Sequence, residues 1–377
     1  EYPFKGLCGA AVAYKLVEAL CEANGQDVAD LDYLLENVAI ATVADVMDLT
    51  EENRILVKQG LEMLKRTSNL GLRALIQCIG LEGKKIQAYH IGFILAPCLN
   101  ASGKLDTAKR ALALLRAKTE READMLAGDL KALNESRRDM TDRVVDEAMA
   151  KVERTDIRGD KVLVIYLPDC HESLAGLVAG RVRENYYRPV FVLTDSEDGV
   201  KGSGRSIESY SMYEELTGCG DLLTKFGGHP MAAGLSLDKE NVEKFKRRLN
   251  DQCTLSEEEL TEKVVIDMEL PFAAITEHFI EELEYMEPFG KGNTKPVFAA
   301  RGVVMQHVKI IGKNKNVAKA TAIDAAGNRM EAICFHDAQE FAKQCERNNG
   351  KMSITFYPGI NEFRGERQIQ IVITHYR

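Results

Sequence analysis

The sequence contains no run of about 18 apolar residues, the length that a membrane-spanning helix requires. It also shows no secretory leader, with a basic start, an apolar centre and a small-residue cleavage site. We therefore expect no membrane association and a cytoplasmic location.

Paired cysteines and excess positive charge are missing too. None of the nine cysteines forms a C-x-x-C pair, and the net charge is −9. An odd, unpatterned set of cysteines argues against a disulfide framework and a zinc knuckle, and it favours a reducing compartment. Any site for a polyanion must therefore depend on a local concentration of basic residues.

The chain has 377 residues, of which 45% are hydrophobic and 28% are charged. This length and composition predict two or three globular domains. The chain does not begin with methionine, and the opening "EYPFKGLCGAAVAYKL" resembles the interior of a domain. We expect a fragment that lacks an N-terminal part.

The first half of the chain divides into two regions. Residues 1–104 alternate helical and strand-like patterns, which favours an α/β layer. Within them "LLENVAIATVADV" (residues 34–46) is apolar, partly β-branched and ends in an acid, as a buried parallel strand would. Residues 105–158 lack proline and are rich in Ala, Leu, Arg and Glu, so they predict a long connecting helix with a break near Gly128.

The second half predicts two further domains. Residues 159–252 place the helical "LAGLVAGRVRENYY" between the strand-like "KVLVIYL" and "RPVFVLTD", which predicts a smaller α/β domain. Residues 262–377 contain about five strand-like segments separated by Gly/Asn turns, as in a small barrel of the OB kind. The expected fold class is α/β, with a C-terminal OB-like β-barrel.

Asp45 is a candidate metal ligand. It follows the apolar segment 34–46, and ligands of open α/β sheets bind at the carboxyl ends of strands. A carboxylate there suits Mg²⁺ or Mn²⁺, which prefer oxygen ligands. A helix cap or a solvated loop acid is the alternative, since no other Asp/His cluster accompanies it.

Two loops that precede helices are candidate anion sites. Asn100 and Lys104 lie in "CLNASGKLDTAKRAL", where backbone amides at a helix start and a lysine would hold an anion. His171 precedes a helix in "PDCHESLAGLVAGR". The alternatives are a simple capped loop at the first position and helix capping at the second.

Two segments of the smaller α/β domain combine glycine with polar residues. "KGSGRSI" carries Ser203, Arg205 and Ser206, and arginine binds phosphate in a bidentate manner. "KFGGHPMAAG" carries Gly227, Gly228 and His229, where glycine permits positive φ and close approach of a ligand. A lone surface arginine and a tight turn with a satisfied histidine are the alternatives.

The strongest local charge lies at the start of the β-rich region. Residues 291–319 contain seven Lys/Arg, including Lys309, Lys313 and Lys315, and no Asp or Glu. A basic OB barrel is a common platform for single-stranded nucleic acid. The aromatic residues that could stack on bases are Phe289, Phe298, Phe356, Tyr357 and Phe363. A solvated charged face with core aromatics is the alternative.

Taken together, these motifs resemble one family along nearly the whole chain. That family is the RecJ single-strand-specific exonucleases of the DHH phosphoesterase superfamily. The segments that carry the resemblance are "TVADVMDLTEENRILVKQGL", "LNASGKLDTAKRAL", "HESLAGLVAGRVRENYYRPVFVL", "GSGRSI", "FGGHPMAAGL" and "LEYMEPFGKGNTKPVF".

The resemblance implies a 5′-to-3′ exonuclease that degrades single-stranded DNA in repair and recombination, with a two-metal centre holding Mn²⁺ or Mg²⁺. It also implies roles for individual segments. Asp45 matches the family's last metal-binding aspartate, and "GSGRSI" matches the segment whose serine and arginine hold substrate phosphate. "FGGHPMAAG" matches the signature of the DHH-associated domain, and His229 is the residue that we expect to act in catalysis.

The sequence departs from the family pattern in two ways. The aspartate-rich first motif and the Asp-His-His motif, which lie upstream in the family, are absent from these 377 residues. We therefore expect an incomplete metal centre and an inactive fragment. Lys104 stands where many relatives carry arginine, which puts a bidentate phosphate contact there in doubt.

Two other functions remain open from the sequence. One is a non-catalytic module that binds single-stranded nucleic acid, and the other is a phosphoesterase that acts on short oligonucleotides or cyclic dinucleotides. The expected partners are single-stranded DNA and other DNA-repair proteins, and the expected oligomeric state is a monomer.

Overall fold

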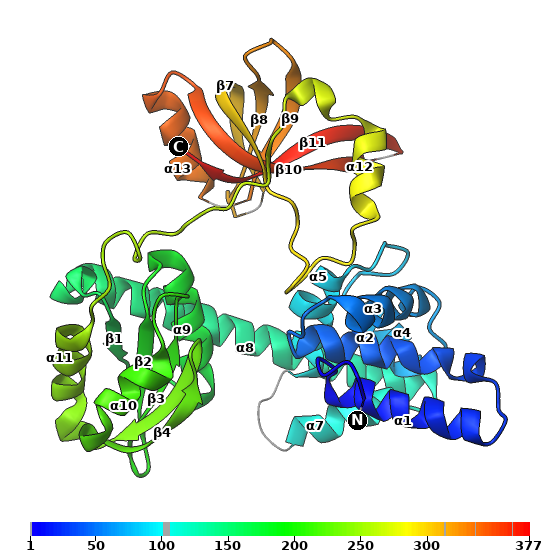
Figure 1. Ribbon diagram of the computed structural model, residues 1–377, viewed down its shortest axis with the longest axis horizontal. Helices are drawn as coiled ribbons and strands as arrows, with labels where there is room; N and C mark the ends of the chain where they lie inside the picture. Colours follow the sequence, from blue (N-terminus) through cyan, green and yellow to red (C-terminus); the bar gives the residue numbers. More distant parts are fainter. Residues whose placement is uncertain (1, 101–105, 313, 336, 364) are drawn as a thin grey trace. The chain divides into compact units, whose positions relative to one another are not determined.

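The computed structural model describes residues 2–100, 106–312, 314–335, 337–363 and 365–377. The chain forms two compact units, of which the first joins Glu1–Pro97 to Val264–Arg377 and the second is Cys98–Lys263 (Figure 1). Among the described residues, no helix combines the length and the apolar character needed to cross a membrane.

The N-terminal segment of the first unit is helical. The strand predicted over residues 34–46 is wrong, because Leu35–Ala44 form the helix α2. The run is mostly apolar because most of α2 is buried, and its three alanines favour a helix although four of its residues are β-branched. A Cβ at Gly60 would lie 2.3 Å from the carbonyl oxygen of Leu35, so glycine allows the close packing of α3 on α2. The elements are α1 (Gly9–Ala23), η1 (Val28–Leu34), α2 (Leu35–Ala44), α3 (Glu51–Leu64), α4 (Leu70–Cys78), α5 (Ala88–His90), η2 (Ile91–Leu95) and α6 (Ala96–Leu99).

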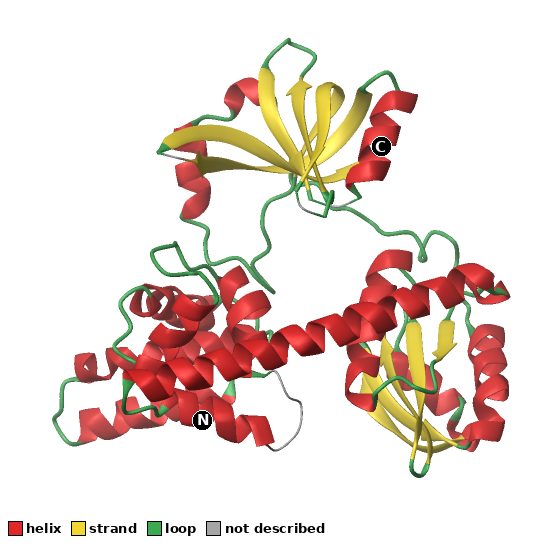
Figure 2. Ribbon diagram, turned by 180° about the vertical axis from the view of Figure 1, so that it is seen from behind, coloured by secondary structure: helices red, strands yellow, loops and turns green. Residues whose placement is uncertain are grey.

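The C-terminal segment of the first unit is a closed barrel (Figure 2). Its strand order is β7-β8-β9-β11-β10, and β10 also pairs with β7, which closes the sheet. The buried rings of Phe298 and Phe356 fill its core. The OB-like barrel is thus confirmed. The elements are β6 (Met268–Glu269), η6 (Phe272–Ala274), α12 (Glu277–Glu284), β7 (Phe298–Ile311), β8 (Val317–Ile323), β9 (Arg329–Cys334), α13 (Ala338–Arg347), β10 (Lys351–Phe363) and β11 (Glu366–Tyr376).

A seam joins the helical segment to the segment that precedes the barrel. The amide of Leu49 donates to the carbonyl of Lys291 at 2.7 Å, and the Lys291 ammonium pairs with Asp48 at 2.9 Å. Arg54 donates to the carbonyl of Tyr285 at 2.8 Å. Residues distant in sequence therefore hold the two segments of this unit together.

The second unit begins with two helices, and the break between them lies closer to the N-terminus than the position near Gly128 that the sequence predicted within residues 105–158. The two helices are α7 (Asp106–Leu115) and α8 (Glu120–Arg154). The interruption lies at 116–119, where the Thr119 hydroxyl caps α8 by accepting from the amide of Glu122. Gly128 lies inside α8 and does not break it.

The rest of the second unit is a five-stranded sheet in the order β1-β2-β3-β5-β4, in which only β1 and β2 are parallel. Helix α9 connects these two strands, as in a β-α-β unit. The predicted smaller α/β domain is confirmed. Its elements are η3 (Asp156–Gly159), β1 (Leu163–Tyr166), α9 (Glu172–Tyr186), β2 (Val190–Ser196), β3 (Gly199–Arg205), α10 (Met212–Gly218), η4 (Gly220–Leu222), β4 (Leu223–His229), β5 (Ala232–Leu237), η5 (Lys239–Asn241) and α11 (Val242–Gln252).

The two faces of this sheet are covered unequally. On one face Phe191 and Leu235 form a core with Phe245 of α11. On the other face, Val190 and Val192 pack with Val178 of α9. Helix α9 packs on β2 and β3 but leaves the same face of β5 and β4 uncovered.

Candidate nucleic-acid interface

An open face extends over β5 and β4, which α9 leaves uncovered, and over the part of β3 beside the helix. It carries cationic, hydroxyl and small side chains in register. Directly opposite residues in a sheet project on the same side, and neighbouring strands lie about 4.8 Å apart. Arg205 is opposite Ala232, which is opposite His229, so Arg205 and His229 occupy one row about 10 Å apart. The two further rows are Ser203–Gly234–Gly227 and Lys201–Ser236–Lys225.

The N-terminal end of α9 forms a wall beside these rows. A cavity of about 530 Å³ lies between them, lined by Ser173 of α9 and by Ser203, Gly227 and Lys225 of the sheet. Lys201, at its edge, pairs with Glu172 at 2.8 Å. The floor is shallow because its central strand contributes only small side chains, so an extended polyanion could lie against it.

Arg205 is the most unusual charge of this face. Its guanidinium is partly buried and donates to the carbonyl of Gly204 at 2.8 Å. A Cβ at Gly176 would lie 2.7 Å from the Arg205 Nη2 atom, so glycine on α9 makes room for the guanidinium. Burial and the nearby Arg183 lower the pKa of Arg205. Within the described part of the chain no carboxylate pairs with Arg205, which leaves it ready to bind an anion.

The glycines around the site serve different purposes. Cβ atoms at Gly202 and Gly204 would lie within 2.8 Å of core side chains such as Leu193 and Phe191, so these glycines serve the core on the opposite face. Gly228 has a φ of 152°, and a Cβ there would lie 2.4 Å from the carbonyl oxygen of Ala232. Gly227 meets nothing within 4 Å, and Gly234 opposite it meets only a backbone oxygen at 3.9 Å, so these two glycines keep the face open.

The Gly228→Ala variant should therefore lose stability, by about 1–3 kcal/mol, because alanine at this φ is strained and meets backbone. Gly227→Ala is the matched control and should change the free energy of unfolding by less than about 1 kcal/mol. Urea denaturation of both variants checks this. Equal losses would show that the two glycines have the same role.

Two histidines lie at the edges of this region. His229 is exposed at the end of β4. His171 is exposed at the N-cap of α9, where its Nδ1 accepts from the amide of Ser173 at 3.2 Å and lies 2.7 Å from the Ser173 hydroxyl. The histidine, and not Ser173, therefore caps this helix.

Other sequence-predicted residues lie away from the open face. Ser206 is only 1% exposed and its hydroxyl donates to the carbonyl of Tyr210, so it supports the turn after β3. Asn100 is exposed in a turn and its carbonyl accepts from Arg137 at 2.8 Å. Lys104 falls outside the described residues.

Asp45 does not end a strand. It is the exposed C-cap of α2, followed by Val46 with a φ of 54°. No group of three or more His, Cys, Asp or Glu that could hold a metal ion occurs in the described ranges. Asp45 by itself supplies one carboxylate, and these residues do not fit a complete two-metal centre.

The basic segment of the barrel is partly neutralised. Arg301 pairs with Glu269 at 3.2 Å and Lys319 with Glu331 at 2.6 Å. Lys309 is exposed opposite Lys319 on the β7–β8 hairpin, and Lys315 is exposed near its tip. Lys313 lies outside the described residues.

Two of the expected stacking aromatics are unsuitable. Phe298 is 2% exposed and Phe356 is fully buried, so the prediction that they stack on bases is wrong. Alternation along β7 and β10 directs both rings into the barrel core. Phe289 and Tyr357 are half-buried and lie edge to face, with the ammonium of Lys295 at 4.6 Å from the Tyr357 ring. The side chain of Phe363 falls outside the described residues.

Sequence reasoning missed Lys201 and Lys225. Both could have been found by the period of two that places strand residues on one face. Lys201, Ser203 and Arg205 alternate on β3, and Lys225, Gly227 and His229 alternate on β4.

Comparison with known proteins bears on this site. The family model described as the DHHA1 domain matches residues 159–255, and the RecJ OB domain matches residues 266–375. The single-stranded-DNA-specific exonuclease RecJ of Bacillus subtilis is 35% identical over 99% of this chain and 47% of its own length. The protein of that name from Salmonella typhimurium is 33% identical over 99% of this chain and 67% of its own length.

The structural comparison agrees. The crystal structure of RecJ from Thermus thermophilus in complex with Mg²⁺ matches 100% of this chain with a TM-score of 0.82 at 26% identity, and the chain covers 57% of it. The Mn²⁺ complex of the same protein gives a TM-score of 0.81. The chain therefore spans about half to two thirds of the length of these relatives.

Proposed function

Because the chain belongs to the RecJ family of single-stranded-DNA-specific exonucleases, we propose that it is part of a 5′-to-3′ exonuclease that hydrolyses single-stranded DNA in repair and recombination. The observation that carries this proposal is the open face of β3, β5 and β4. At one end of it lies the guanidinium of Arg205, which pairs with no carboxylate among the described residues. A single strand has a phosphate at each nucleotide, so an extended row of cations and hydroxyls suits it better than a compact anion.

Five residues of this face have proposed roles. Arg205 and Ser203 hold a phosphate, because a guanidinium and a hydroxyl offer donors to its oxygens. Lys225 attracts the neighbouring phosphates, and the open backbone at Gly227 lets the strand approach. His229, in the row of Arg205, would contact the phosphate that is attacked and transfer a proton there.

A divalent metal ion is the proposed cofactor. Relatives crystallised with Mg²⁺ or Mn²⁺ support a divalent ion, and Asp45 is the carboxylate that we assign to it. The remaining ligands would come from sequence that these 377 residues do not contain. The chain alone should therefore not shorten a single strand when Mn²⁺ is added, and shortening would contradict this assignment.

Neutralising Lys225 should make binding of a single strand less dependent on salt. Each lost phosphate contact reduces the slope of log K against log salt by about 0.7 for a single strand. Fluorescence anisotropy of labelled oligo-dT with Lys225→Gln, and separately with Lys309→Gln plus Lys315→Gln, measures this slope.

The matched control is Lys244→Gln. Lys244 is exposed on α11, which packs against the opposite face of the sheet. The slope of log K against log salt for Lys244→Gln should therefore equal that of the unsubstituted chain. An unchanged slope in Lys225→Gln would reject the open face as the path of the strand. Single-strand binding without cleavage after the upstream motifs are supplied would favour the non-catalytic alternative.

A further inference from the structure

Two aromatic rings stack on the surface of the helical segment. Tyr89 of α5 and Phe93 of η2 lie with their ring centroids 4.9 Å apart and their planes at 28°. Their exposed fractions are 60% and 71%. The turn that carries Phe93 is a π-helix, a rare conformation that is frequent at functional sites. Single exposed aromatics need no explanation, but an exposed stacked pair presents a flat apolar surface to solvent.

Tyr89 also lines a cavity of about 200 Å³. The other walls are α3, which contributes Lys58, and the segment before the barrel, which contributes Phe289 and Lys295. A space of this size accommodates one nucleobase. Aromatic rings on two sides and lysines at its margin match the flat ring and the charged backbone of a nucleotide.

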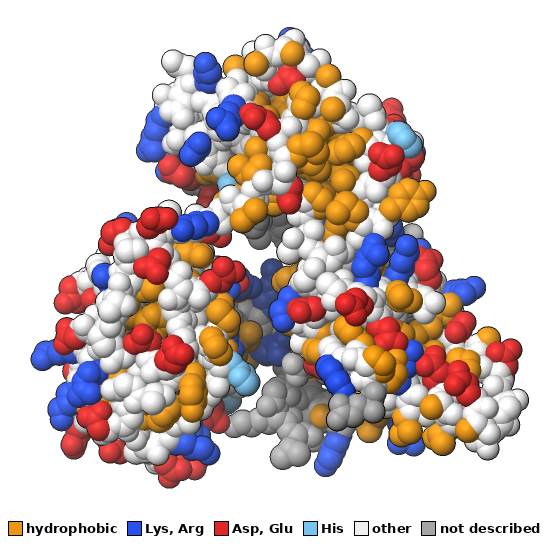
Figure 3. Space-filling view, viewed as in Figure 1, with side chains coloured by type: hydrophobic (Ala, Val, Ile, Leu, Met, Phe, Trp, Pro, Cys, Tyr) orange, Lys and Arg blue, Asp and Glu red, His pale blue; other side chains and the backbone are white. Residues whose placement is uncertain are grey.

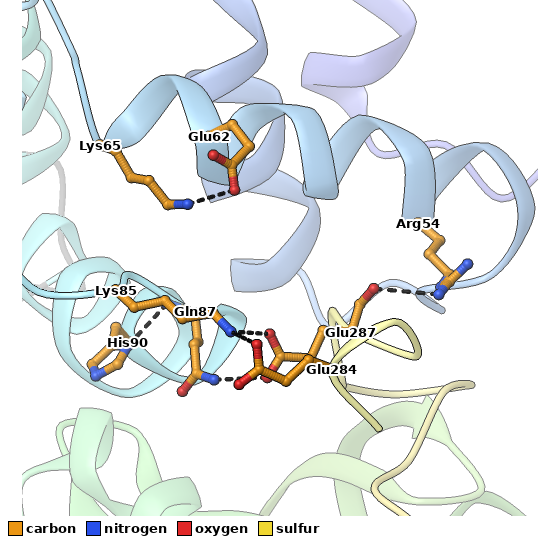
Figure 4. Close-up of polar contacts among 8 residues, drawn as sticks. All are labelled: Arg54, Glu62, Lys65, Lys85, Gln87, His90, Glu284 and Glu287. Atoms are coloured by element: carbon orange, nitrogen blue, oxygen red, sulfur yellow. Dashed lines mark hydrogen bonds and ion pairs between the residues drawn. The ribbon is translucent and has the colours of Figure 1, made fainter. Parts of the chain in front are cut away.

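The charges around the cavity favour an anionic ligand. The three acidic side chains that line it are already engaged. Lys85 pairs with Glu284 at 2.9 Å and with Glu287 at 3.2 Å, and Lys65 pairs with Glu62 at 2.6 Å (Figure 4). The Gln87 amide also donates to Glu287, at 2.8 Å. Within the described residues Lys58 has no ion pair, and Lys295 is held over the aromatic rings and not by a carboxylate.

We propose that Tyr89 and Phe93 form a stacking platform for an unpaired base of single-stranded DNA, and that Lys58 and Lys295 bind the adjacent phosphates. This inference rests on the proposed action on single strands and adds a second contact region to the open face of the sheet. Stacking on aromatic side chains does not depend on base identity, so the platform would hold strands of any sequence.

The absence of tryptophan from the chain gives a direct test. The Tyr89→Trp variant introduces one indole into the platform, and Tyr33→Trp introduces one at a site that is 58% exposed outside the cavity. Titration with oligo-dT should quench the fluorescence of Tyr89→Trp with the same midpoint as binding measured by anisotropy. The fluorescence of Tyr33→Trp should stay constant.

Affinity gives the second readout. Phe93→Ala and Phe93→Leu should each weaken binding of oligo-dT by about five- to tenfold, and Phe93→Tyr should restore it, because stacking requires a ring. All three should unfold at the same urea concentration as the unsubstituted chain, since Phe93 is exposed.

Three outcomes would overturn the inference. Binding without quenching of Tyr89→Trp, or full affinity in Phe93→Ala, would mean that the platform serves another partner such as a protein, while the proposed function stands. No binding of oligo-dT to the unsubstituted chain would reject the proposed function together with this inference.

Discussion

Replacing His229 by alanine is expected to slow the cleavage of single-stranded DNA by about 10²–10⁴-fold, the usual contribution of a positioned acid or base. His229 projects from the same face of the sheet as Arg205 and is exposed, so it can reach a phosphate bound there. The assay requires this chain joined to the upstream metal motifs of the family, with Mn²⁺ and a 5′-labelled strand.

The matched control is His278→Ala. His278 is also exposed, on α12 of the barrel segment, and its loss should leave cleavage unchanged. The free energy of unfolding should be the same in both variants within about 0.5 kcal/mol, as for most surface substitutions. A His229→Ala protein that unfolds readily but keeps its specific activity would show that the histidine is structural.

Replacing Arg205 by alanine is expected to weaken binding of oligo-dT by about 30- to 100-fold. Truncating a partly buried charge that pairs with a ligand costs about 2–5 kcal/mol of binding free energy. The other contacts of the strand recover part of this loss. Arg205→Lys should recover little of this affinity. The ammonium cannot form the bidentate contact of a guanidinium. Anisotropy with the same labelled strand measures both variants.

Urea unfolding distinguishes an anion-binding role of Arg205 from a structural role. Burial and Arg183 already disfavour the charge of Arg205, and no carboxylate in the described part of the chain compensates it. Arg205→Ala should therefore keep or raise the midpoint of urea unfolding while it loses affinity. A clear fall in the midpoint, with affinity retained, would identify Arg205 as a packing residue.

The sequence predicted the later domains better than the first. In residues 159–252 and 262–377 apolar and polar residues alternate along the strands, because one side of most strands faces a core. This pattern was sufficient to predict the sheet and the barrel. The segment 34–46 misled because a helix buried on all sides and a buried strand are both uniformly apolar. Asp45 consequently lies at a helix end and not at a strand end.

The candidate site was predictable in its components but not in its arrangement. Ser203, Arg205 and His229 were identified from two separate segments, and only strand pairing through β5 shows that they share a face. Gly202 and Gly204 of "KGSGR" make space for the core side chains Leu193, Phe191 and Met212, a role that the sequence pattern did not predict. Which side of a strand requires glycine depends on residues distant in sequence.

The extent to which the basic side chains are neutralised was also difficult to predict from the sequence. The basic run from Lys291 to Lys319 contains no acid, yet Asp48, Glu269 and Glu331 from other segments neutralise three of its members. Basic and acidic side chains are interspersed on the face of the molecule in Figure 3. A local count of charges therefore overestimated the positive potential of the barrel.

The seam between the helical segment and the barrel segment has a consequence for biosynthesis. Its partners, such as Leu49 and Lys291, are separated in the chain by the whole second unit. At about 5–20 residues per second, the helical segment waits on the order of ten seconds or more for its partner to be translated. The second unit is continuous in sequence and can fold during this interval. The helical segment is synthesised before the second unit but completes its contacts with the barrel segment only after that unit, so the surface that it buries at the seam stays exposed in the meantime.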